Sequence, residues 1–316
     1  MPSGNQTSVT EFIFLSFSSS HGLQIFLFVF LSLVYMLTIT GNIAIIVIVQ
    51  TSQQLHTPMY LFLSNLAMME IGHMSNTIPK MLVDFLAGRK SISVSGCITQ
   101  LYFNIFLGAT ENFLLVAMAY DRYLAICHPL NYATVMNARI CGRLAFSCWV
   151  SGFLVPLFPS VFLYQLSFCG PRKIDHFFCD LAPVLQLSCT DTSISEISFL
   201  SCTWTVVLGC FMLIMASYVH IIYAVLRMPS IAGQHKAFST CTAHLIVVAI
   251  YYGSTIYMYV RPSVGYTVRS DKVVSVFYCV VTPFLNPFIY SLRNREVREA
   301  FRTALAKTRD VSKHVA

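Results

Sequence analysis

Long stretches without a charged residue constrain the fold of this chain more than any other feature of its sequence. Five such stretches contain no Asp, Glu, Lys or Arg: 12–69, 144–171, 197–226, 237–260 and 273–292. A helix that crosses a bilayer needs about 20 mostly apolar residues, and each stretch reaches that length. Only 10% of all residues are charged, whereas a soluble domain carries roughly 25%. Most of the chain is therefore expected to lie in lipid.

Two further segments are apolar but contain isolated polar groups. Segment 58–86 contains Glu70, His73 and Asn76, and segment 97–126 contains Asn104 and Glu111. Helices satisfy their backbone hydrogen bonds within one segment, whereas membrane β-strands are about half as long and alternate in polarity. We therefore predict an all-α membrane protein, a seven-transmembrane helix bundle, with spans at about 25–49, 58–82, 97–126, 141–164, 197–226, 237–260 and 272–292.

The basic residues predict the orientation of the bundle. With the N-terminus outside, 12 of the 20 lysines and arginines lie on the cytoplasmic side, in the sense of the positive-inside rule. Asn5 begins an N-x-T glycosylation acceptor, which is used only on the outer face. We expect no cleavable signal peptide, because the first apolar stretch is too long and lacks a basic segment before it. The predicted division is an extracellular N-terminus 1–24, a transmembrane domain 25–292 and a cytoplasmic segment 293–316.

The cytoplasmic segment begins with an amphipathic pattern. Val297, Phe301 and Leu305 recur every four residues, and charged residues occupy the opposite face. This pattern predicts a short helix on the inner leaflet, although a solvated basic tail is the alternative. The formal net charge of +7 is interpreted as attraction to membrane lipid, and we predict no nucleic-acid partner.

Four cysteines are expected outside the membrane, where oxidising conditions permit disulfides. They are Cys97, Cys169, Cys179 and Cys189. Three pairings are open to four cysteines, and their spacing does not choose among them. Three of the four fall in the long connection 165–196 between spans four and five. A connection of that length is usually functional or cross-linked.

Four polar side chains are expected at similar depth in the bilayer. At about 1.5 Å of rise per residue, Glu70 lies roughly 18 Å from the cytoplasmic start of its span, and Glu111 roughly 21 Å from the outer start of its own. Asn42 and Asn286 fall at comparable depths. Two close carboxylates do not both ionise without a counter-ion, so we predict a sodium ion or a shared proton here. Two independent neutral acids are the alternative.

Prolines interrupt two of the predicted spans. Pro156 and Pro159 fall in span four, and Pro283 and Pro287 fall in span seven. Because proline removes one helical hydrogen bond, these are expected points of bending.

Five motifs then give the chain a family resemblance. The Asp-Arg-Tyr and Asn-Pro-x-x-Tyr elements resemble those of rhodopsin-like G-protein-coupled receptors, and the fuller forms are similar to those of odorant receptors. The motifs are PMYLFLSNL at 58–66, MAYDRY at 118–123, Ser-Tyr at 217–218, KAFSTCTAHL at 236–245 and PFLNPFIY at 283–290. The resemblance runs from Asn5 to Arg295 and is of the tetrapod type (class II).

The resemblance implies a switch for G-protein coupling. Arg122 corresponds to the arginine that pairs with the preceding aspartate in the inactive state and turns toward the G protein in the active state. Glu70 stands where most rhodopsin-like receptors have Asp, which puts the geometry of a sodium site in doubt, and Glu111 matches the second acid of odorant receptors. The implied switch residues are Asp121, Arg122, Tyr123, Tyr218, Asn286, Pro287 and Tyr290.

The resemblance also implies two disulfides, Cys97–Cys179 and Cys169–Cys189. A metal site at 176–180 is not expected, because a cysteine in a disulfide is no thiolate ligand.

The ligand pocket implied by the resemblance is mostly apolar, as small-molecule sites are. We expect no acid or base in it, so a cationic amine would lack a counter-ion, and span seven has no lysine for retinal. Its predicted lining is Asn104, Ile105, Gly108, Ala109, Cys202, Val206, Tyr252, Thr255, Ile256, Tyr259, Val276 and Cys279.

The resulting prediction is an odorant receptor at the plasma membrane. It would bind a small, neutral, largely apolar volatile ligand and activate a stimulatory, olfactory-type G protein that raises cAMP. The alternative is an ion-coupled transporter that uses Glu70 and Glu111, which the absence of an inverted repeat in the sequence disfavours. No catalytic constellation is present in the sequence, so an enzyme is not expected. Whether a trafficking chaperone is needed stays open.

Overall fold

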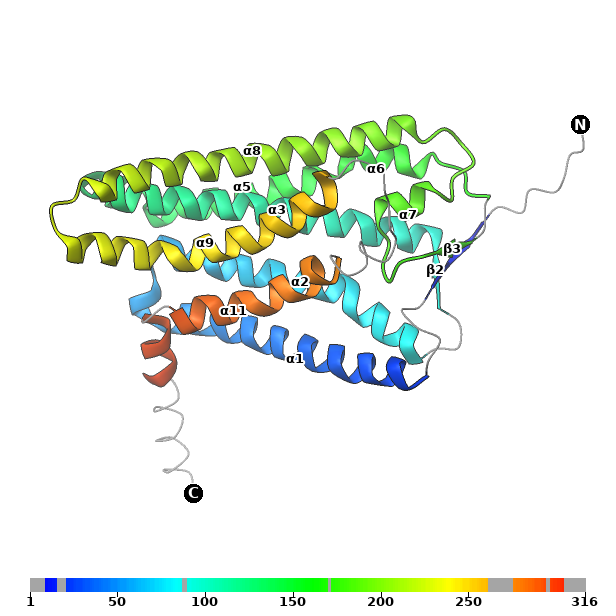
Figure 1. Cartoon of the computed structure of the whole chain (residues 1–316), viewed down its shortest axis with the longest axis horizontal. Coiled ribbons are helices and arrows are strands. Elements are labelled where there is room, and N and C mark those ends of the chain that lie inside the picture. The colour runs from blue at the N-terminus through cyan, green and yellow to red at the C-terminus, as the bar shows by residue number, and fades with distance from the viewer. Residues whose placement is uncertain are drawn as a thin grey trace, which may run out of the picture.

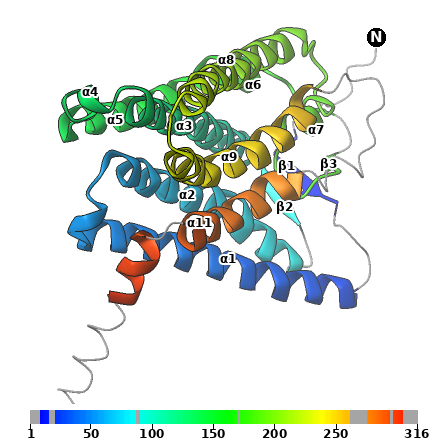
Figure 2. The same cartoon turned by 60° about the vertical axis from the view of Figure 1, so that its left-hand side comes forward.

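Long helices lie side by side along most of the chain (Figure 1; Figure 2). This computed structural model describes residues 9–15, 21–86, 90–169, 172–260, 275–293 and 296–303, without the side chains of 236, 257–260, 277–278 and 291–293. The bundle consists of α1 (His21–Thr51), α2 (Pro58–Leu86), α3 (Val94–Cys127), α5 (Ala138–Leu154) with α6 (Leu157–Tyr164), α8 (Ser193–Leu226), α9 (Ile231–Val260), and η2 (Phe277–Val281) with α11 (Thr282–Arg293).

These helices correspond to the seven predicted spans, so the predicted fold class is confirmed. Several extend beyond the predicted ends, since polar residues continue a helix past the apolar layer. Five are long and apolar enough to cross a membrane, namely α1, α3, α8, the α5–α6 pair and residues 231–256 of α9. Helix α2 has 29 residues but carries polar groups along its length. Residues 279–290 form a shorter apolar helix, and the predicted start of span seven at 272 lies outside the described residues.

Side chains accept hydrogen bonds from backbone N–H groups at the starts of several helices, as at α5 and α8. Asn137 accepts a hydrogen bond from the Ile140 backbone N–H at 3.0 Å where α5 begins. Before α8, Asp191 accepts from the Ser193 backbone N–H and hydroxyl at 3.0 and 2.6 Å. These two hydrogen bonds lower the pKa of the exposed Asp191 carboxyl below its ordinary value. Such caps satisfy N–H groups that have no partner within the helix.

Two of the four predicted bending points, Pro156 and Pro283, coincide with an interruption of the helix, whereas Pro159 and Pro287 lie inside α6 and α11. Helix α5 ends at Leu154 and α6 begins at Leu157, with Pro156 between them. Pro287 lies inside α11, and the π-helical turn η2 comes just before Pro283.

Helix α3 is the central helix of the bundle. Its most apolar window is 67% buried, whereas the corresponding window of α1 is 17% buried. It packs tightly against α5 at Gly152, where an added Cβ would lie 2.1 Å from Thr110 Oγ1 and 2.9 Å from the Thr110 backbone nitrogen. Close approach through small residues is the usual way in which membrane helices pack.

A small sheet caps one end of the bundle. Its strand order is β2-β1-β3, formed by Ser91–Ser93, Glu11–Phe14 and Lys173–Ile174. Strand β1 is antiparallel to β2 and parallel to β3. Next to the sheet lies the short helix α7 (Leu181–Leu185). Because both disulfides also lie here, we call this the disulfide end. Strands of two to four residues are too short for a recognisable alternation, so the sequence did not predict them.

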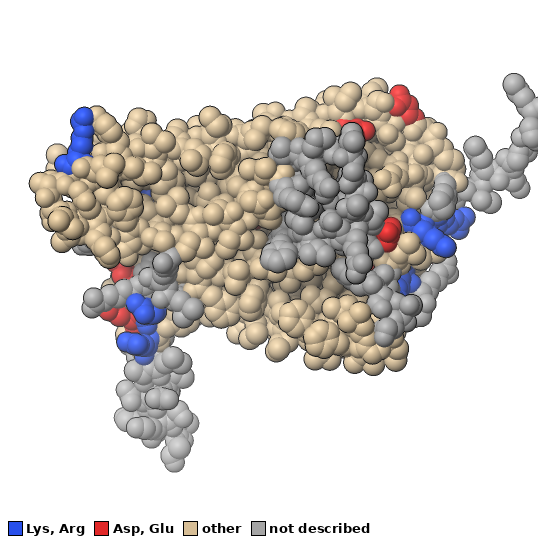
Figure 3. Space-filling model, in the orientation of Figure 1, with Lys and Arg blue, Asp and Glu red and all other residues tan. Residues whose placement is uncertain are grey.

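The opposite end, which we call the Arg122 end, carries two short helices. Helix α4 (Pro129–Val135) follows α3. Residues 296–303 form a helix that turns away from the bundle (red in Figure 1), with Val297 and Ala300 buried and Arg298 and Glu299 exposed. It lies inside the segment predicted to be amphipathic. On the face drawn in Figure 3, charged side chains gather at the two ends of the molecule, and the broad middle is uncharged among the described residues.

Candidate functional site

One disulfide attaches the long connection between α6 and α8 to helix α3, and a second disulfide joins two points within that connection. Cys97 near the start of α3 is bonded to Cys179, and Cys169 is bonded to Cys189. This is the pairing that the resemblance implies. Both Cys97 and Cys179 are fully buried. The first bridge therefore holds residues 176–180 over the ends of the helices.

Under this segment lies a cavity of about 60 Å³. Its walls come from α3, α8 and α9, and the segment after α6 contributes Phe178 and Asp180. The lining residues are Leu101, Asn104, Ile105, Gly108, Ala109, Asn112, Val155, Phe178, Asp180, Phe199, Thr203, Val206, Val207, Tyr251, Thr255 and Ser275.

The floor of the cavity is a hydrogen-bonded group of three buried side chains. Asn112 Nδ2 donates to the Tyr251 hydroxyl at 2.7 Å, and the Tyr252 hydroxyl donates to Asn112 Oδ1 at 2.8 Å. The Tyr251 hydroxyl donates in turn to the Gly108 carbonyl at 3.0 Å. The group fixes α9 to α3 directly below the cavity.

Deeper in the bundle lie the two acids that the sequence singles out. Glu70 and Glu111 are 1% and 3% exposed. Asn286 Nδ2 donates to Glu70 Oε1, and Asn42 lies within hydrogen-bonding reach of the same carboxyl. The two carboxyl groups are close enough to interact electrostatically. The structure thus brings together four side chains that are far apart in the sequence.

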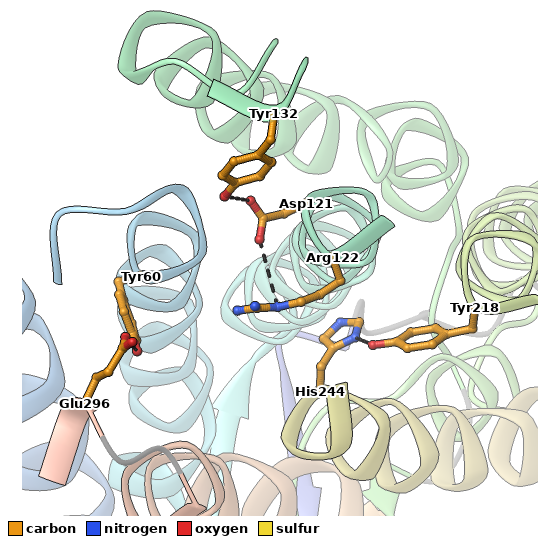
Figure 4. Close-up of polar contacts among 7 residues, drawn as sticks. All are labelled: Tyr60, Asp121, Arg122, Tyr132, Tyr218, His244 and Glu296. Atoms are coloured by element: carbon orange, nitrogen blue, oxygen red, sulfur yellow. Dashed lines mark hydrogen bonds and ion pairs between the residues drawn. The ribbon is translucent and has the colours of Figure 1, made fainter. Parts of the chain in front are cut away.

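At the Arg122 end, polar contacts hold the predicted switch residues (Figure 4). Arg122 Nε lies 3.9 Å from Asp121 Oδ2, and the Tyr132 hydroxyl of α4 donates to Asp121 Oδ1 at 2.8 Å. On the other side, the Tyr218 hydroxyl and His244 Nδ1 are 2.7 Å apart. Both partners of this second contact are buried.

The remaining switch residues are Tyr123, Pro287 and Tyr290. The Tyr123 hydroxyl lies 3.0 Å from His128 Nε2. Tyr290 is 3% exposed and lines a tightly packed space with Asn286 and Pro287. The Tyr60 hydroxyl donates to Glu296 Oε2 at 2.6 Å, which attaches the helix at 296–303 to α2.

Residues 31–308 match the family model described as olfactory receptor. The chain belongs to the olfactory receptor family. Human olfactory receptor 6N1 is 50% identical to it over 97% of this chain and 98% of the relative, and human olfactory receptor 10C1 is 48% identical over 97% and 98%. The crystal structure of squid rhodopsin covers 90% of this chain and 81% of that chain, with a TM-score of 0.71 and 17% identity, which shows the fold alone. The chain is a multi-pass membrane receptor and not an enzyme.

Half of the residues predicted to line the pocket of this olfactory receptor do line the cavity. Asn104, Ile105, Gly108, Ala109, Val206 and Thr255 line it. Five others do not: Tyr252 lies in the floor, Cys279 packs in a cluster with α1 and α2, and Cys202, Ile256 and Val276 are half-buried outside the lining. A helix presents only one face to a cavity, and counting along the sequence selected neighbours from the adjoining faces. The Tyr259 side chain and Asn5 lie outside the described residues.

None of the residues predicted to line the pocket is an acid or a base, but the described lining of the cavity includes one charged group. Asp180 lines the cavity, and its Oδ1 accepts a hydrogen bond from the Leu181 backbone N–H at 2.8 Å, which caps α7. The lining was predicted from the spans alone, whereas Asp180 lies in the connection between α6 and α8. The available signal was Cys179, since a disulfide to α3 necessarily brings the next residue to the same place.

Removing the Tyr132 hydroxyl is expected to raise basal signalling. Burial raises the pKa of Tyr132 above its ordinary value, so the phenol stays protonated and donates to Asp121. That hydrogen bond stabilises the ionised carboxylate, and a neutral Asp121 would hold Arg122 less tightly. Since one hydrogen bond contributes about 0.5–1.5 kcal/mol, Tyr132→Phe should raise basal cAMP by about two- to tenfold at equal surface expression. Tyr120→Phe, the same change on an exposed ring, is the control. A lower basal level in Tyr132→Phe would contradict this role.

Proposed function

We propose that this receptor detects a small, neutral, largely apolar volatile molecule in the cavity under Cys179. The observation that carries the proposal is the lining itself, in which aliphatic and aromatic side chains from three helices surround a few polar atoms. Small-molecule sites have this composition. No Lys or Arg occurs in the described lining, and Asp180 disfavours an anionic ligand by repulsion. The floor formed by Asn112, Tyr251 and Tyr252 is the expected route by which a bound ligand acts on α9.

The proposed partner at the Arg122 end is a stimulatory, olfactory-type G protein that raises cAMP. Arg122 lies between Asp121 on one side and the Tyr218–His244 contact on the other (Figure 4). A charged side chain with two alternative sets of contacts is a two-state element, which a cytoplasmic partner biases by binding one state.

We propose that the disulfide end faces the outside of the plasma membrane and that the C-terminus is cytoplasmic. Disulfides form in oxidising compartments, which supports this orientation. The excess of basic residues at the Arg122 end supports it too. Membrane lipid then contacts the exposed apolar side chains along the bundle, such as Phe26, Phe146 and Met212. Use of Asn5 as a glycosylation site is part of the same proposal.

For the buried acids we propose a shared proton rather than a sodium ion. The space lined by Asn42, Glu70, Asn286 and Tyr290 has a cavity volume of about 0 Å³, so its own side chains fill it. A bound sodium ion needs several oxygen ligands arranged around a space of its own size. A proton needs only two oxygen atoms, and the electrostatic interaction between the buried carboxyl groups of Glu70 and Glu111 supports this choice.

A cAMP-reporter screen of volatile compounds in cells that express the full-length receptor tests the proposed function. Wild type is expected to respond to some neutral compounds, and Arg122→Ala is expected to lose the response at equal surface expression. Gln186→Ala, a polar-to-alanine change at the end of α7, serves as the matched control and should respond as wild type does. A response that persists in Arg122→Ala would refute coupling through this arginine. A well-expressed receptor that responds to no compound would refute the proposed ligand class.

A further inference from the structure

A second hollow lies on the flank of the bundle, outside the ligand cavity. It is a groove between α3, α5 and α8, which run side by side (Figure 1; Figure 2). Its cavity volume is about 720 Å³, within the range of about 300–1,000 Å³ that small-molecule sites have. It shares only Val206 with the described lining of the cavity under Cys179. The groove is therefore large enough to hold a molecule of its own.

Each of the three helices contributes one stripe to the groove. The lining residues fall within 113–120 of α3, 144–151 of α5 and 205–213 of α8, and they recur every three or four residues, as one helix face does. Each stripe covers about two turns, or roughly 11 Å. Ala117, Cys148 and Cys210 form a buried floor of small side chains, whereas Tyr120 and Leu213 at the rim are exposed. The groove is thus short, broad and open toward the surroundings of the bundle.

The surroundings of the groove are the apolar layer of the membrane. Phe146 of α5 and Met212 of α8 lie next to lining residues and are 71% and 65% exposed, as lipid-facing side chains of a multi-pass receptor are. None of the described lining residues is charged. The hydroxyls of Ser147 and Thr205 donate to carbonyls of their own helices at 2.8 and 2.7 Å. The groove therefore offers no charged partner for a lipid headgroup and suits an apolar molecule that enters from the bilayer.

The shape of the groove favours a rigid ring system over an acyl chain. Contacting carbon atoms lie about 3.5–4.0 Å apart, so one hydrocarbon chain is about 4 Å wide. A volume of about 720 Å³ within roughly 11 Å of length is several times wider than that. A flexible chain also loses rotational freedom when it is held in place, whereas fused rings have little freedom to lose. A flat ring face matches the floor of small side chains.

The walls of the groove belong to helices that carry the predicted switch. On α3, Tyr120 of the rim stands two residues before Arg122, and on α8, Gly209 of the lining stands nine residues before Tyr218. A movement of α3 against α8 therefore changes the width of the groove. The groove is open in this conformation, in which Arg122 Nε lies 3.9 Å from Asp121 Oδ2. A molecule that binds only the open groove favours this conformation over others.

We infer that a membrane sterol occupies the groove between α3, α5 and α8 and holds the receptor in its resting conformation. A sterol combines a flat, rigid and almost wholly apolar ring system with a permanent place in the bilayer. It would act as a negative regulator at a site separate from the ligand cavity. The inference rests on the proposed function, because the resting conformation is the one in which Asp121 holds Arg122.

The test measures basal cAMP in cells that express the full-length receptor, normalised to surface expression. Extraction of sterol with a cyclodextrin is expected to raise basal cAMP by about two- to tenfold, because an occupant at about one to ten times its Kd shifts a two-state equilibrium by that factor. Reloading with cholesterol should reverse the rise. Its mirror image, ent-cholesterol, has the same size and polarity but the wrong handedness for a groove of right-handed helices, and should not. No effect of extraction, or equal reversal by both enantiomers, would overturn the inference.

A variant that fills the groove tests the location of the site. An added Cβ at Gly209 would meet no atom within 4 Å, so the side chain of Gly209→Leu enters the groove without a clash. Basal cAMP of this variant should no longer respond to sterol extraction. Gly253→Leu, the same change at an exposed and equally open position of α9, is the matched control and should respond as wild type does. A full sterol response in Gly209→Leu would overturn the inference.

Crosslinking identifies the occupant without relying on signalling, and it decides if Gly209→Leu does not reach the surface. Cholesterol with a photoactivatable ring is expected to label α5 or α8 of the wild-type receptor, and excess cholesterol should compete. Labelling by phosphatidylcholine with a photoactivatable acyl chain, but not by the sterol, would assign the groove to an acyl chain and overturn the inference.

The outcomes separate this inference from the proposed function. Ligand responses that persist while basal cAMP is insensitive to sterol would overturn the inference and leave the proposed function standing. A surface-expressed receptor that raises no cAMP under any condition would overturn the proposed function, and the sterol crosslink alone would then decide whether the groove is occupied.

Discussion

Replacing Cys97 with serine is expected to reduce the receptor at the cell surface by more than about tenfold, because loss of a structural disulfide typically costs 2–5 kcal/mol of stability. Cys97 and Cys179 are both fully buried, and their bridge closes a loop with a sequence separation of 82. Without it, residues 176–180 lose their attachment to α3, and Phe178 and Asp180 leave the cavity wall. Surface staining of an N-terminally tagged receptor measures the effect, and Cys179→Ser should behave alike.

Two further serine variants act as controls for this prediction. The Cys169–Cys189 bridge has a sequence separation of only 20. On the chain-entropy account the longer loop contributes about 1 kcal/mol more, so Cys169→Ser should be milder. Cys202 is a free, half-buried cysteine of α8, and Cys202→Ser should leave surface expression unchanged. Normal surface expression and normal responses in Cys97→Ser would show that the first bridge has no structural role.

The spans of the fold were predictable, because a long apolar segment in lipid has few alternatives to a helix. The breaks were predictable too, since proline removes a hydrogen bond wherever it stands, as between α5 and α6. The short strands at the disulfide end of the bundle were not predictable. Strand β1 at Glu11–Phe14 exists only because Ser91–Ser93 and Lys173–Ile174 lie on either side of it. A strand of four residues that forms by pairing with distant segments is too short to show a recognisable alternation in the sequence.

The candidate site, too, was predictable only in part. Asn104 and Thr255 could be placed in the cavity by counting along helices from a motif. The groups around them could not, because Asn76 Nδ2 meets Asn104 Oδ1 and Asp180 joins the lining only after the helices and a disulfide are assembled. His244 belongs to a motif noted in the sequence, but its contact with Tyr218 depends on how α8 and α9 cross. Side-chain identity is thus local information, whereas hydrogen-bond direction is a property of the packed bundle.

Neutralising either buried acid is expected to change signalling strongly, in basal cAMP or in the maximal response. Glu70 accepts from Asn286, interacts with Glu111 and is almost fully buried, so water does not screen the pair. A surface pair would contribute only about 0–1 kcal/mol. In Glu70→Gln, the new amide oxygen still accepts from Asn286, and the change therefore removes the charge while preserving that contact. On the proposed shared proton, Glu111 then loses the carboxyl group that holds the proton with it.

The double variant makes this prediction decisive. If the two carboxyl groups share one proton, Glu70→Gln combined with Glu111→Gln should be less harmful than the sum of the single changes, by about 0.5–3 kcal/mol of coupling. Basal and ligand-evoked cAMP are compared across the four receptors at equal surface expression. Glu196→Gln, the same change on the exposed first turn of α8, is the control and should match wild type. Simple additivity would mean that the two acids act independently, as two neutral carboxyl groups bonded to the backbone would, and the shared proton would then have to be abandoned.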